Sequence, residues 1–197
     1  MTDLETLGVR ERIIETATGL FVAQGYDGVS MREIAAACNL SKAGLYYHFK
    51  DKEDLFLAIL DENLTEFDAL LGSIEAQAGS VRDKIVAYVR AIFTQLPQSH
   101  RAIIRLAAQD MAKINPTARA AFDQRYQDKF LSHLKRILEA GMASGHIRAF
   151  NPQLGVWALL GLMYPFLNQN LSESAEEIDR VVGLIEMVFF EGVEPRP

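Results

Sequence analysis

Residues 30–49 read SMREIAAACNLSKAGLYYHF, and this stretch decides how the N-terminal part of the chain folds. Ser30 and Glu33 have the spacing of a capping box, so we expect a helix to begin after Ser30. A turn follows, and Ser41 is placed to cap a second short helix. Two short helices joined by a tight turn are typical of a helix-turn-helix, whose second helix enters the DNA major groove.

The second helix holds more large side chains than one buried face can accept. Leu45 and Phe49 are four residues apart, so we expect both to face inward. Tyr46 is expected to pack in part against the first helix of the chain. Tyr47 and His48 are then left to face outward, where they can contact phosphate groups or a thymine methyl group. These aromatic residues therefore indicate a contact surface.

The charge of this segment differs from that of the whole chain. The 197 residues have a formal net charge of −6, which argues against a wholly basic nucleic-acid coat protein. Between residues 30 and 52, four basic residues stand against two acidic ones: Arg32, Lys42, Lys50 and Lys52 against Glu33 and Asp51. A locally positive segment on an acidic chain suits contact with DNA.

Small residues at the two helix starts fit the same interpretation. Hydroxyl groups and free backbone N–H groups at Ser30 and Ser41 can hold phosphate oxygens. Lys42 lies on the first turn of the second helix, the end that faces base edges. Gly44 costs about 1 kcal/mol of helix propensity relative to alanine, which close approach to the duplex would offset. A three-helix bundle that does not bind DNA needs the same caps, so that alternative stays open.

The rest of the chain is also predicted to be helical, so we expect an all-α protein. A first helix ends near Gly25, and Asp51 can cap a long helix from residue 52 to about 74. Asn115-Pro116 and Asn151-Pro152 each place an N-cap residue before a proline at the first helical position. Ser174 and Glu177 have the spacing of another capping box, and we expect the last helix to end at Gly192.

Two domains are expected from this organisation. Residues 1–50 form a three-helix DNA-binding head with the helix-turn-helix at about 30–49, and residues 51–197 form a larger helical regulatory and dimerisation body. Cys38 is the only cysteine, which excludes an internal disulfide and favours a reducing compartment. No signal peptide is apparent, and the longest apolar run, residues 156–167, is shorter than the ~20 residues that span a bilayer. We expect a soluble, cytoplasmic protein.

Residues 10–56 resemble the DNA-binding head of the tetracycline-repressor (TetR) family. The matching features are LFVAQGYDGVS at residues 20–30, REIA at 32–35 and LSKAGLYYHFKDKEDL at 40–55. The resemblance implies a homodimer on a palindromic operator in double-stranded DNA, with a ligand pocket in the body. It further implies DNA contacts at Ser30, Arg32, Ser41, Lys42, Gly44, Tyr46, Tyr47, His48 and Lys52.

The last two predicted helices carry more apolar surface than one chain needs. One face of the final helix has Ile178, Val182, Ile185 and Phe189, and a second apolar face remains. Pairing with a second chain, in a four-helix interface, would cover that second face. The predicted dimer interface comprises Gly155, Ala158 and Gly161 on one helix and Val181, Leu184 and Val188 on the other. A helix fully buried within one chain is the alternative.

A small-molecule site is a further expectation for the body. Pro165 is expected to kink the helix predicted over residues 152–171, because proline removes an internal hydrogen bond. We expect an apolar or aromatic ligand near this kink, with Arg101 or Arg105 at a polar or anionic end. The predicted lining comprises Phe93, Arg101, Arg105, Phe122, Tyr126, Trp157, Met163 and Tyr164. Core packing and a solvated helix face are the alternatives for these residues.

Signatures of catalysis are missing from the sequence. It contains no GxSxG, P-loop, dinucleotide fingerprint or HExxH motif, and its four histidines lack metal-ligand spacing. We therefore expect no enzyme, no cofactor and no metal. The predicted function is that of a sequence-specific DNA-binding transcriptional regulator, most simply a repressor that a small molecule releases from its operator. A regulator that responds to a protein partner or to no ligand, or that acts as an activator, shares every feature of the head.

Overall fold

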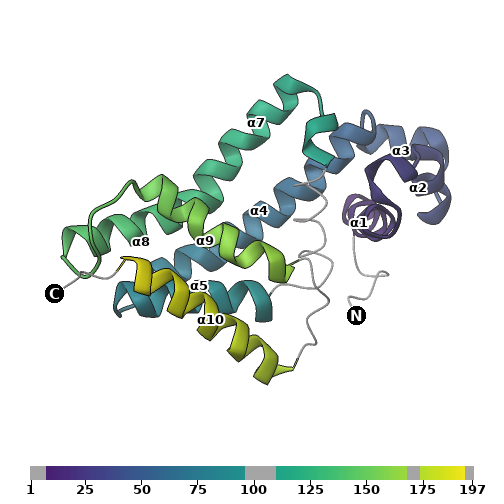
Figure 1. Ribbon diagram of the computed structural model, residues 1–197. Helices are drawn as coiled ribbons and strands as arrows, with labels where there is room; N and C mark the ends of the chain where they lie inside the picture. Colours follow the sequence, from purple (N-terminus) through teal and green to yellow (C-terminus); the bar gives the residue numbers. More distant parts are fainter. Residues whose placement is uncertain (1–7, 96–109, 168–173, 194–197) are drawn as a thin grey trace. The chain divides into compact units, whose positions relative to one another are not determined.

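The computed structural model describes residues 8–95, 110–167 and 174–193. Within these ranges the regular structure is entirely helical, which confirms the predicted all-α class there. None of the helices described is both long and apolar enough to cross a membrane. The elements, shown in Figure 1, are α1 (Val9–Gly28), α2 (Met31–Ala37), α3 (Lys42–His48), α4 (Lys52–Ala76), α5 (Val81–Thr94), η1 (Met111–Lys113), α7 (Pro116–Tyr126), η2 (Gln127–Leu131), α8 (Ser132–Ala143), α9 (Pro152–Leu167) and α10 (Ala175–Val193).

The chain forms two compact units. One contains residues 1–63 and 98–122, and the other contains residues 64–97 and 123–197. The division between them therefore falls inside α4 and inside α7. Residues 110–122, although distant in sequence, belong to the same unit as the three N-terminal helices.

The first unit is built around the packing of α1, α2 and α3. Gly25 interrupts α1 with φ 75° and ψ 169°, a conformation that glycine adopts without strain, at the position where the sequence predicts a helix end. Just beyond it, the Tyr26 ring packs against Phe56 of α4 with centroids 5.0 Å apart. Phe21 packs edge-on against the same Phe56 ring, at 5.4 Å. This aromatic cluster joins the end of α1 to the start of α4.

Side-chain caps begin several helices where the sequence predicts them. The side-chain oxygens of Asp51, Asn115 and Asn151 each accept a backbone N–H hydrogen bond at 2.8 or 2.9 Å. Ser80 and Asp83 form a further capping box at the start of α5, which the predictions above do not include. Local hydrogen bonds of this kind satisfy the free N–H groups of a first helical turn, which makes the starts predictable.

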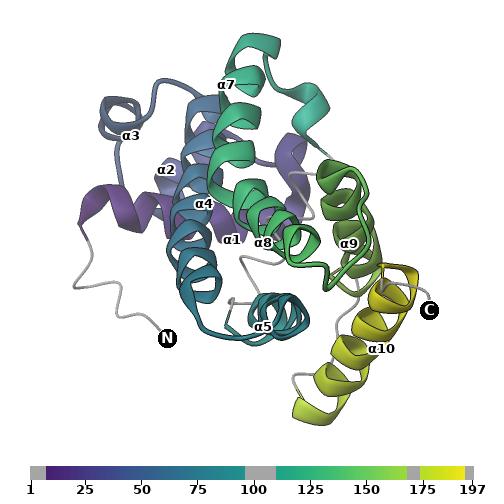
Figure 2. The ribbon, with the colours of Figure 1, turned by 90° about the vertical axis from the view of Figure 1, so that its left-hand side faces the viewer.

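The second unit is a packed set of helices. Figure 2 shows α10 beside α5 and α9, and α8 also packs against α5 and α9. Buried side chains from these helices, including Tyr88, Leu138, Leu159 and Ile185, form its core. Pro165 lies inside α9, which is described as far as Leu167; the remainder of the predicted 152–171 helix lies outside the described residues.

Candidate nucleic-acid interface

The recognition helix candidate is α3, whose start is fixed by Ser41. The Ser41 hydroxyl oxygen accepts the Gly44 N–H at 3.0 Å and so caps the helix as predicted. Leu45 and Phe49 are buried, which confirms that they face the interior of the unit. One face of α3 is thereby anchored, and the opposite face is free to meet a partner.

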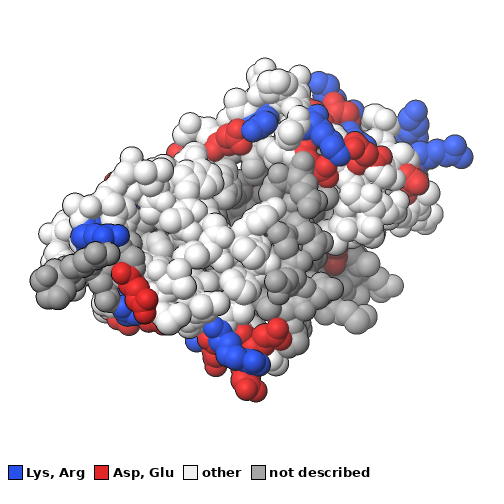
Figure 3. Space-filling view, in the orientation of Figure 1, with Lys and Arg blue, Asp and Glu red and all other residues white. Residues whose placement is uncertain are grey.

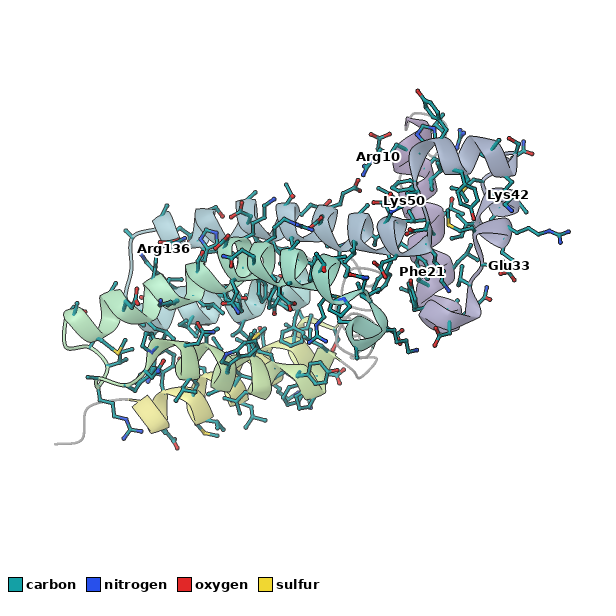
Figure 4. The ribbon with its side chains drawn as sticks, turned by 90° about the horizontal axis from the view of Figure 1, so that it is seen from above. Arg10, Phe21, Glu33, Lys42, Lys50 and Arg136 are labelled. Atoms are coloured by element: carbon teal, nitrogen blue, oxygen red, sulfur yellow. The ribbon has the colours of Figure 1, made fainter. Side chains whose placement is uncertain are left out.

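The outward face of α3 carries aromatic rings together with a cation. Tyr47 is 86% exposed, and its ring meets the His48 ring edge-on with centroids 5.2 Å apart. Tyr46 is 42% exposed, so part of this residue is covered and part lies at the surface. The Lys42 ammonium lies 5.6 Å from the Tyr46 ring centroid. Figure 4 labels Lys42 on this helix, at the outer surface of the head.

The Ser30 hydroxyl takes part in two hydrogen bonds with Glu33, whereas one is described for the Ser41 hydroxyl. Ser30 donates both its backbone N–H, at 2.8 Å, and its hydroxyl, at 2.6 Å, to Glu33. These bonds complete the predicted capping box. They also lower the pKa of the Glu33 carboxyl, and the bond from the Ser30 hydroxyl has the larger effect. The Ser30 hydroxyl would therefore have to release Glu33 before it could donate to a phosphate oxygen. The Ser41 hydroxyl accepts a hydrogen bond from the Gly44 N–H, so its own hydrogen can still be donated to a phosphate. The neighbouring Arg32 is exposed on α2.

Two further predicted contact residues have structural partners inside the head. The Lys52 ammonium donates to the carbonyl oxygens of Tyr26, at 2.8 Å, and Val29, at 3.0 Å. A Cβ atom at Gly44 would lie 3.3 Å from the Ser41 hydroxyl oxygen, so the cap itself favours a small residue there. These contacts give Lys52 and Gly44 roles in the fold, and their predicted DNA contacts remain predictions.

Charged side chains are unevenly distributed over the surface. Figure 3 shows lysine and arginine side chains over α2 and α3, whereas the surface over α9 carries no Lys, Arg, Asp or Glu. Lys50, just after α3, is exposed and adds to the positive charge of the head. Polyanion binding favours such a positive surface, because phosphate contact releases condensed counterions.

Of the three α10 residues predicted for the dimer interface, two are exposed and one is buried. Leu184 and Val188 are 45% and 44% exposed, and Met187, which the sequence analysis did not select, is exposed beside them. Val181 is only 7% exposed, because it lies one helical turn from Ile178 and Ile185 on the face that packs into the core. Val181 therefore belongs to the interior of its own chain.

The three small residues predicted for the dimer interface on α9 also differ in burial: Gly155 is buried, and Ala158 and Gly161 are exposed. A Cβ atom at Gly155 would lie 2.3 Å from Cε2 of Phe150, so the glycine is required for packing inside the chain. The space beside Gly155 is therefore filled by its own chain, and its predicted part in the dimer interface remains a prediction. Ala158 and Gly161 are exposed, and a Cβ at Gly161 would meet no described atom within 4 Å other than those of its own helix backbone and its two chain neighbours.

An open groove runs along the exposed parts of α9 and α10. Its volume is about 410 Å³, and Arg148 is the one charged residue among those that line it. The lining residues are Arg148, Phe150, Leu154, Gly155, Ala158, Leu162, Val188 and Phe189. The groove thus adjoins the exposed residues that remain as candidates for contact with a second chain.

The predicted ligand-site residues differ in their exposure. Arg101 and Arg105 lie outside the described residues. Trp157 and Tyr164 are 47% and 37% exposed on α9, so part of each side chain lies at the surface. The other predicted residues are buried or partly buried: Phe93, Tyr126 and Met163 in the second unit, and Phe122 in the first.

Aromatic rings gather elsewhere in the second unit, around Phe130. Its ring stacks on Tyr126 with centroids 5.1 Å apart and contacts Phe67 at 5.2 Å and Tyr88 at 6.0 Å. Phe130 lies in η2, a π-helical turn, which is a rare feature that often occurs at functional sites. Phe67 and Phe130 were not selected from the sequence, although Phe130 follows Tyr126 by one helical turn.

Tyr88 stands out in this aromatic cluster because its hydroxyl is buried and forms no hydrogen bond with any residue that the structure describes. Burial is the main cause that raises the pKa of Tyr88 well above its ordinary value, so the group is a neutral hydrogen-bond donor. In the parts of the chain described, no group of histidine, cysteine and acidic side chains could hold a metal ion.

Comparisons with known proteins agree with this arrangement. Residues 13–59 match the family model of bacterial regulatory proteins of the tetR family. YhgD of Bacillus subtilis, an uncharacterized HTH-type transcriptional regulator, is 28% identical over 192 residues, which cover 93% of this chain and 96% of YhgD. AcnR of Corynebacterium glutamicum, an HTH-type transcriptional repressor, is 32% identical over 77 residues, 38% of this chain and 41% of AcnR.

Solved structures extend the likeness to the whole fold. The crystal structure of AibR in complex with isovaleryl coenzyme A and operator DNA superposes with a TM-score of 0.77 at 26% identity. That comparison covers 92% of this chain and 98% of AibR. The family model lies on the head, and the structural likeness includes both units. Residues 13–59 thus carry the head of the TetR family of bacterial regulatory proteins, and the fold of the chain is that of a TetR-type regulator.

Proposed function

We propose that the protein is a transcriptional repressor that inserts α3 into the major groove of a palindromic operator. The observation that carries this proposal is the outward face of α3, where the exposed Tyr47 ring and the Lys42 ammonium accompany a buried opposite face. The cation provides phosphate or guanine contact, and the ring provides contact with sugar, phosphate or a thymine methyl group. The other predicted contact positions on α2 and α3 complete this surface.

Two functional domains follow from the proposal. Residues 1–50 bind DNA, and residues 51–197 carry dimerisation and regulation. The homodimer forms through the exposed residues of α9 and α10, and its two-fold symmetry places the recognition helices about 34–36 Å apart, one turn of DNA. The protein acts on DNA in the cytoplasm as a regulator and not as an enzyme.

The body binds a small, largely apolar molecule that weakens DNA binding. Two observations support this part: the aromatic cluster around Phe130 and the unpartnered hydroxyl of Tyr88 within it. A buried hydroxyl without a partner costs about 1–3 kcal/mol, which a ligand carbonyl oxygen would recover. The structurally similar AibR binds isovaleryl coenzyme A, whose short apolar acyl group carries a carbonyl. A ligand of this chemical class could therefore place its carbonyl oxygen at the Tyr88 hydroxyl.

Operator selection from genomic fragments tests the DNA-binding function. The purified protein is expected to enrich fragments that share a two-fold symmetric sequence, with half-sites one turn of DNA apart. Specificity is then measured as the ratio of the affinity for a selected duplex to the affinity for a scrambled duplex of equal length. An affinity ratio near one for every selected fragment would contradict sequence-specific binding.

Ligand control is tested with isovaleryl coenzyme A as the first probe. Its binding is expected to raise the melting temperature of the wild type and to weaken operator binding by the coupling free energy, typically about 1–3 kcal/mol. Tyr88→Phe should keep or raise the melting temperature without ligand, because it removes an unpartnered hydroxyl, but should reduce both responses.

Ser73→Ala is the control, because it removes an exposed hydroxyl of α4 that donates to the Leu70 carbonyl oxygen at 2.7 Å. Equal responses in the Tyr88→Phe and Ser73→Ala variants would exclude Tyr88 as a ligand contact. If isovaleryl coenzyme A and a wider screen of apolar metabolites all fail to alter melting or operator binding, the body serves dimerisation or a protein partner instead.

A further inference from the structure

A segment far from the helix-turn-helix in sequence holds the turn that leads into it. Asp110 is a buried carboxylate, 84 residues away from Tyr26 in the chain. One of its oxygens accepts the Tyr26 backbone N–H at 3.3 Å, and the other lies 2.7 Å from the Lys113 ammonium. Asp110, Lys113 and Tyr26 all belong to the first compact unit.

Two more contacts tie the same segment to the head. The Lys113 ammonium also donates to the Asp27 carboxylate, so it bridges Asp110 and the residue after Tyr26. The Asn115 backbone N–H donates to the Glu53 carboxylate of α4 at 2.9 Å. Hydrogen bonds that Lys113 donates to Asp110 and then to Asp27 raise the pKa of Lys113 to about 12, so the bridge remains charged at neutral pH. We call residues 110–115 the clamp.

The turn is held from its other side by Lys52. The Lys52 ammonium donates to the Tyr26 carbonyl oxygen at 2.8 Å and lies 4.3 Å from the centroid of the Tyr26 ring. Both backbone polar groups of Tyr26 are therefore bound by charged side chains, Asp110 on the N–H and Lys52 on the carbonyl. Charge-assisted hydrogen bonds of this kind are stronger than neutral ones.

The position of this turn explains why it matters for α2 and α3. Gly25, with φ 75°, gives the chain a change of direction just before Tyr26, and Ser30 begins α2 just after it. The Val29 carbonyl, next to the Ser30 cap, accepts from Lys52 at 3.0 Å. Because α2 packs against both α1 and α3, a shift of the turn moves the recognition helix relative to the rest of the head.

We propose that the clamp, through Asp110 and Lys113, positions the helix-turn-helix and thereby sets operator affinity without touching DNA. This proposal rests on the proposed DNA-binding function. It assigns Lys113, Asp110 and Lys52 to one charged network around the turn at residues 26–29, built from three separate parts of the chain. Lys52 is then a positioning residue of the head.

The experiment compares Lys113→Gln with Lys129→Gln in the full-length protein. Both changes remove one lysine charge, but Lys129 bonds to Thr65 in the second unit. Affinity is measured for the selected operator and for a scrambled duplex at several salt concentrations. Lys113→Gln and Asp110→Asn are expected to weaken operator binding about 3- to 30-fold more than Lys129→Gln, a range typical of residues that act on a site at a distance.

The specificity ratio and the salt dependence separate positioning from other roles. Affinity for the scrambled duplex and the salt slope are expected to match those of Lys129→Gln, since no phosphate contact is lost. A loss of folded protein alone would lower apparent binding to both duplexes equally. Lys113→Arg, which keeps the charge, should retain operator binding.

Two results would overturn the clamp. One is that Lys113→Gln binds the operator as tightly as Lys129→Gln does. The other is that the slope of log affinity against log salt concentration is smaller by about one unit in Lys113→Gln, which marks a direct phosphate contact. A wild type without preference for the selected duplex would instead refute the proposed DNA-binding function, on which the clamp rests. Should Asp110→Asn unfold by circular dichroism, Lys113→Gln decides the test, because its partly exposed side chain tolerates the change.

Discussion

The helices α3 and α9 both expose aromatic side chains, but their surroundings differ. On α3, Tyr47 is accompanied by Lys42 on the same helix and by Lys50 just beyond it. On α9, Trp157 and Tyr164 are exposed in a helix of 16 residues that contains no charged residue at all. Exposure alone therefore does not identify the kind of partner that an aromatic side chain meets.

Charge separates these two kinds of surface. A ring beside an ammonium group suits a polyanion, because the cation binds phosphate while the ring contacts sugar or base. An uncharged helix with exposed apolar residues suits another apolar surface, and interface cores are depleted in charge and enriched in aromatic residues. We therefore expect changes on α3 to affect DNA binding alone, and changes on α9 and α10 to affect assembly.

The largest expected effect is on operator binding. Lys42→Ala combined with Tyr47→Ala should cost about 2–6 kcal/mol of operator affinity, from two contacts of about 1–3 kcal/mol each, without loss of helix content. Fluorescence anisotropy with the selected operator measures the loss. Trp157→Ala is the control on α9 and should bind operator normally at protein concentrations that maintain the dimer. Undiminished affinity in the folded double variant would remove α3 as the recognition helix.

Assembly provides the second test of the comparison. Leu184→Lys with Val188→Lys places two charges on the exposed face of α10 and should weaken dimerisation by about 3–5 kcal/mol, the cost of leaving charges buried and unpaired. Sedimentation at micromolar concentration measures the change. Ala140→Lys, at an exposed position of α8, serves as the control. A monomeric wild type, or a variant that remains as dimeric as the control, would show that this face has another use.

The two glycines of α9 sharpen the assignment of its faces. Gly155→Ala would bring a Cβ atom to 2.3 Å from Phe150 and should lower the free energy of unfolding by about 1–3 kcal/mol. Gly161→Ala meets no atom within 4 Å and should raise helix stability by up to about 1 kcal/mol. Urea denaturation at one fixed protein concentration compares the two. Equal effects would mean that both glycines face the same environment.

The smallest effect concerns the charged surface of the body, away from α9. Arg136 donates to both oxygens of Glu75, at 2.7 and 2.8 Å, and His133 contacts the same carboxylate. Chiefly through Arg136, these contacts lower the pKa of Glu75 from 4.5 to about 2. Because the folded protein holds the ionised form, the resulting stability is full above pH 4.5 and is lost as pH falls towards 2.

Glu75→Gln should therefore cost about 1 kcal/mol at pH 7 and progressively less below pH 4.5. Denaturant unfolding at pH 7 and at pH 3 measures the difference between the variant and the wild type. Glu139→Gln, an exposed partner of Lys135 on the same helix as Arg136, is the control. A cost of Glu75→Gln that does not change with pH would contradict the ion pair as its source.

Local sequence signals predicted the secondary structure of the head well. Ser30, Ser41 and Asp51 cap helices where expected, because each cap joins groups only three residues apart. The burial of Leu45 and Phe49 was also predictable, since helical spacing places both on one face. What these signals imply about contact with DNA at individual positions remains a prediction.

The burial of individual residues in the body has a different physical origin. The residue types of Val181 and Gly155 suit a dimer surface, but their neighbours in the folded chain bury them. Trp157 has a residue type that is usually buried, yet it is 47% exposed. In each case the sequence shows the residue type and its helical face, whereas the direction of that face depends on which other helix covers it.

The sequence by itself determined the helices of the head, their caps and the family resemblance, because these depend on hydrogen bonds and spacings within a few residues. Only the tertiary structure decided the partners of Lys52 and Asp110. Lys52 binds a carbonyl 26 residues away, and Asp110 binds a backbone N–H 84 residues away. No local pattern encodes such contacts, since they exist only when the packing of distant segments brings the donor and the acceptor together.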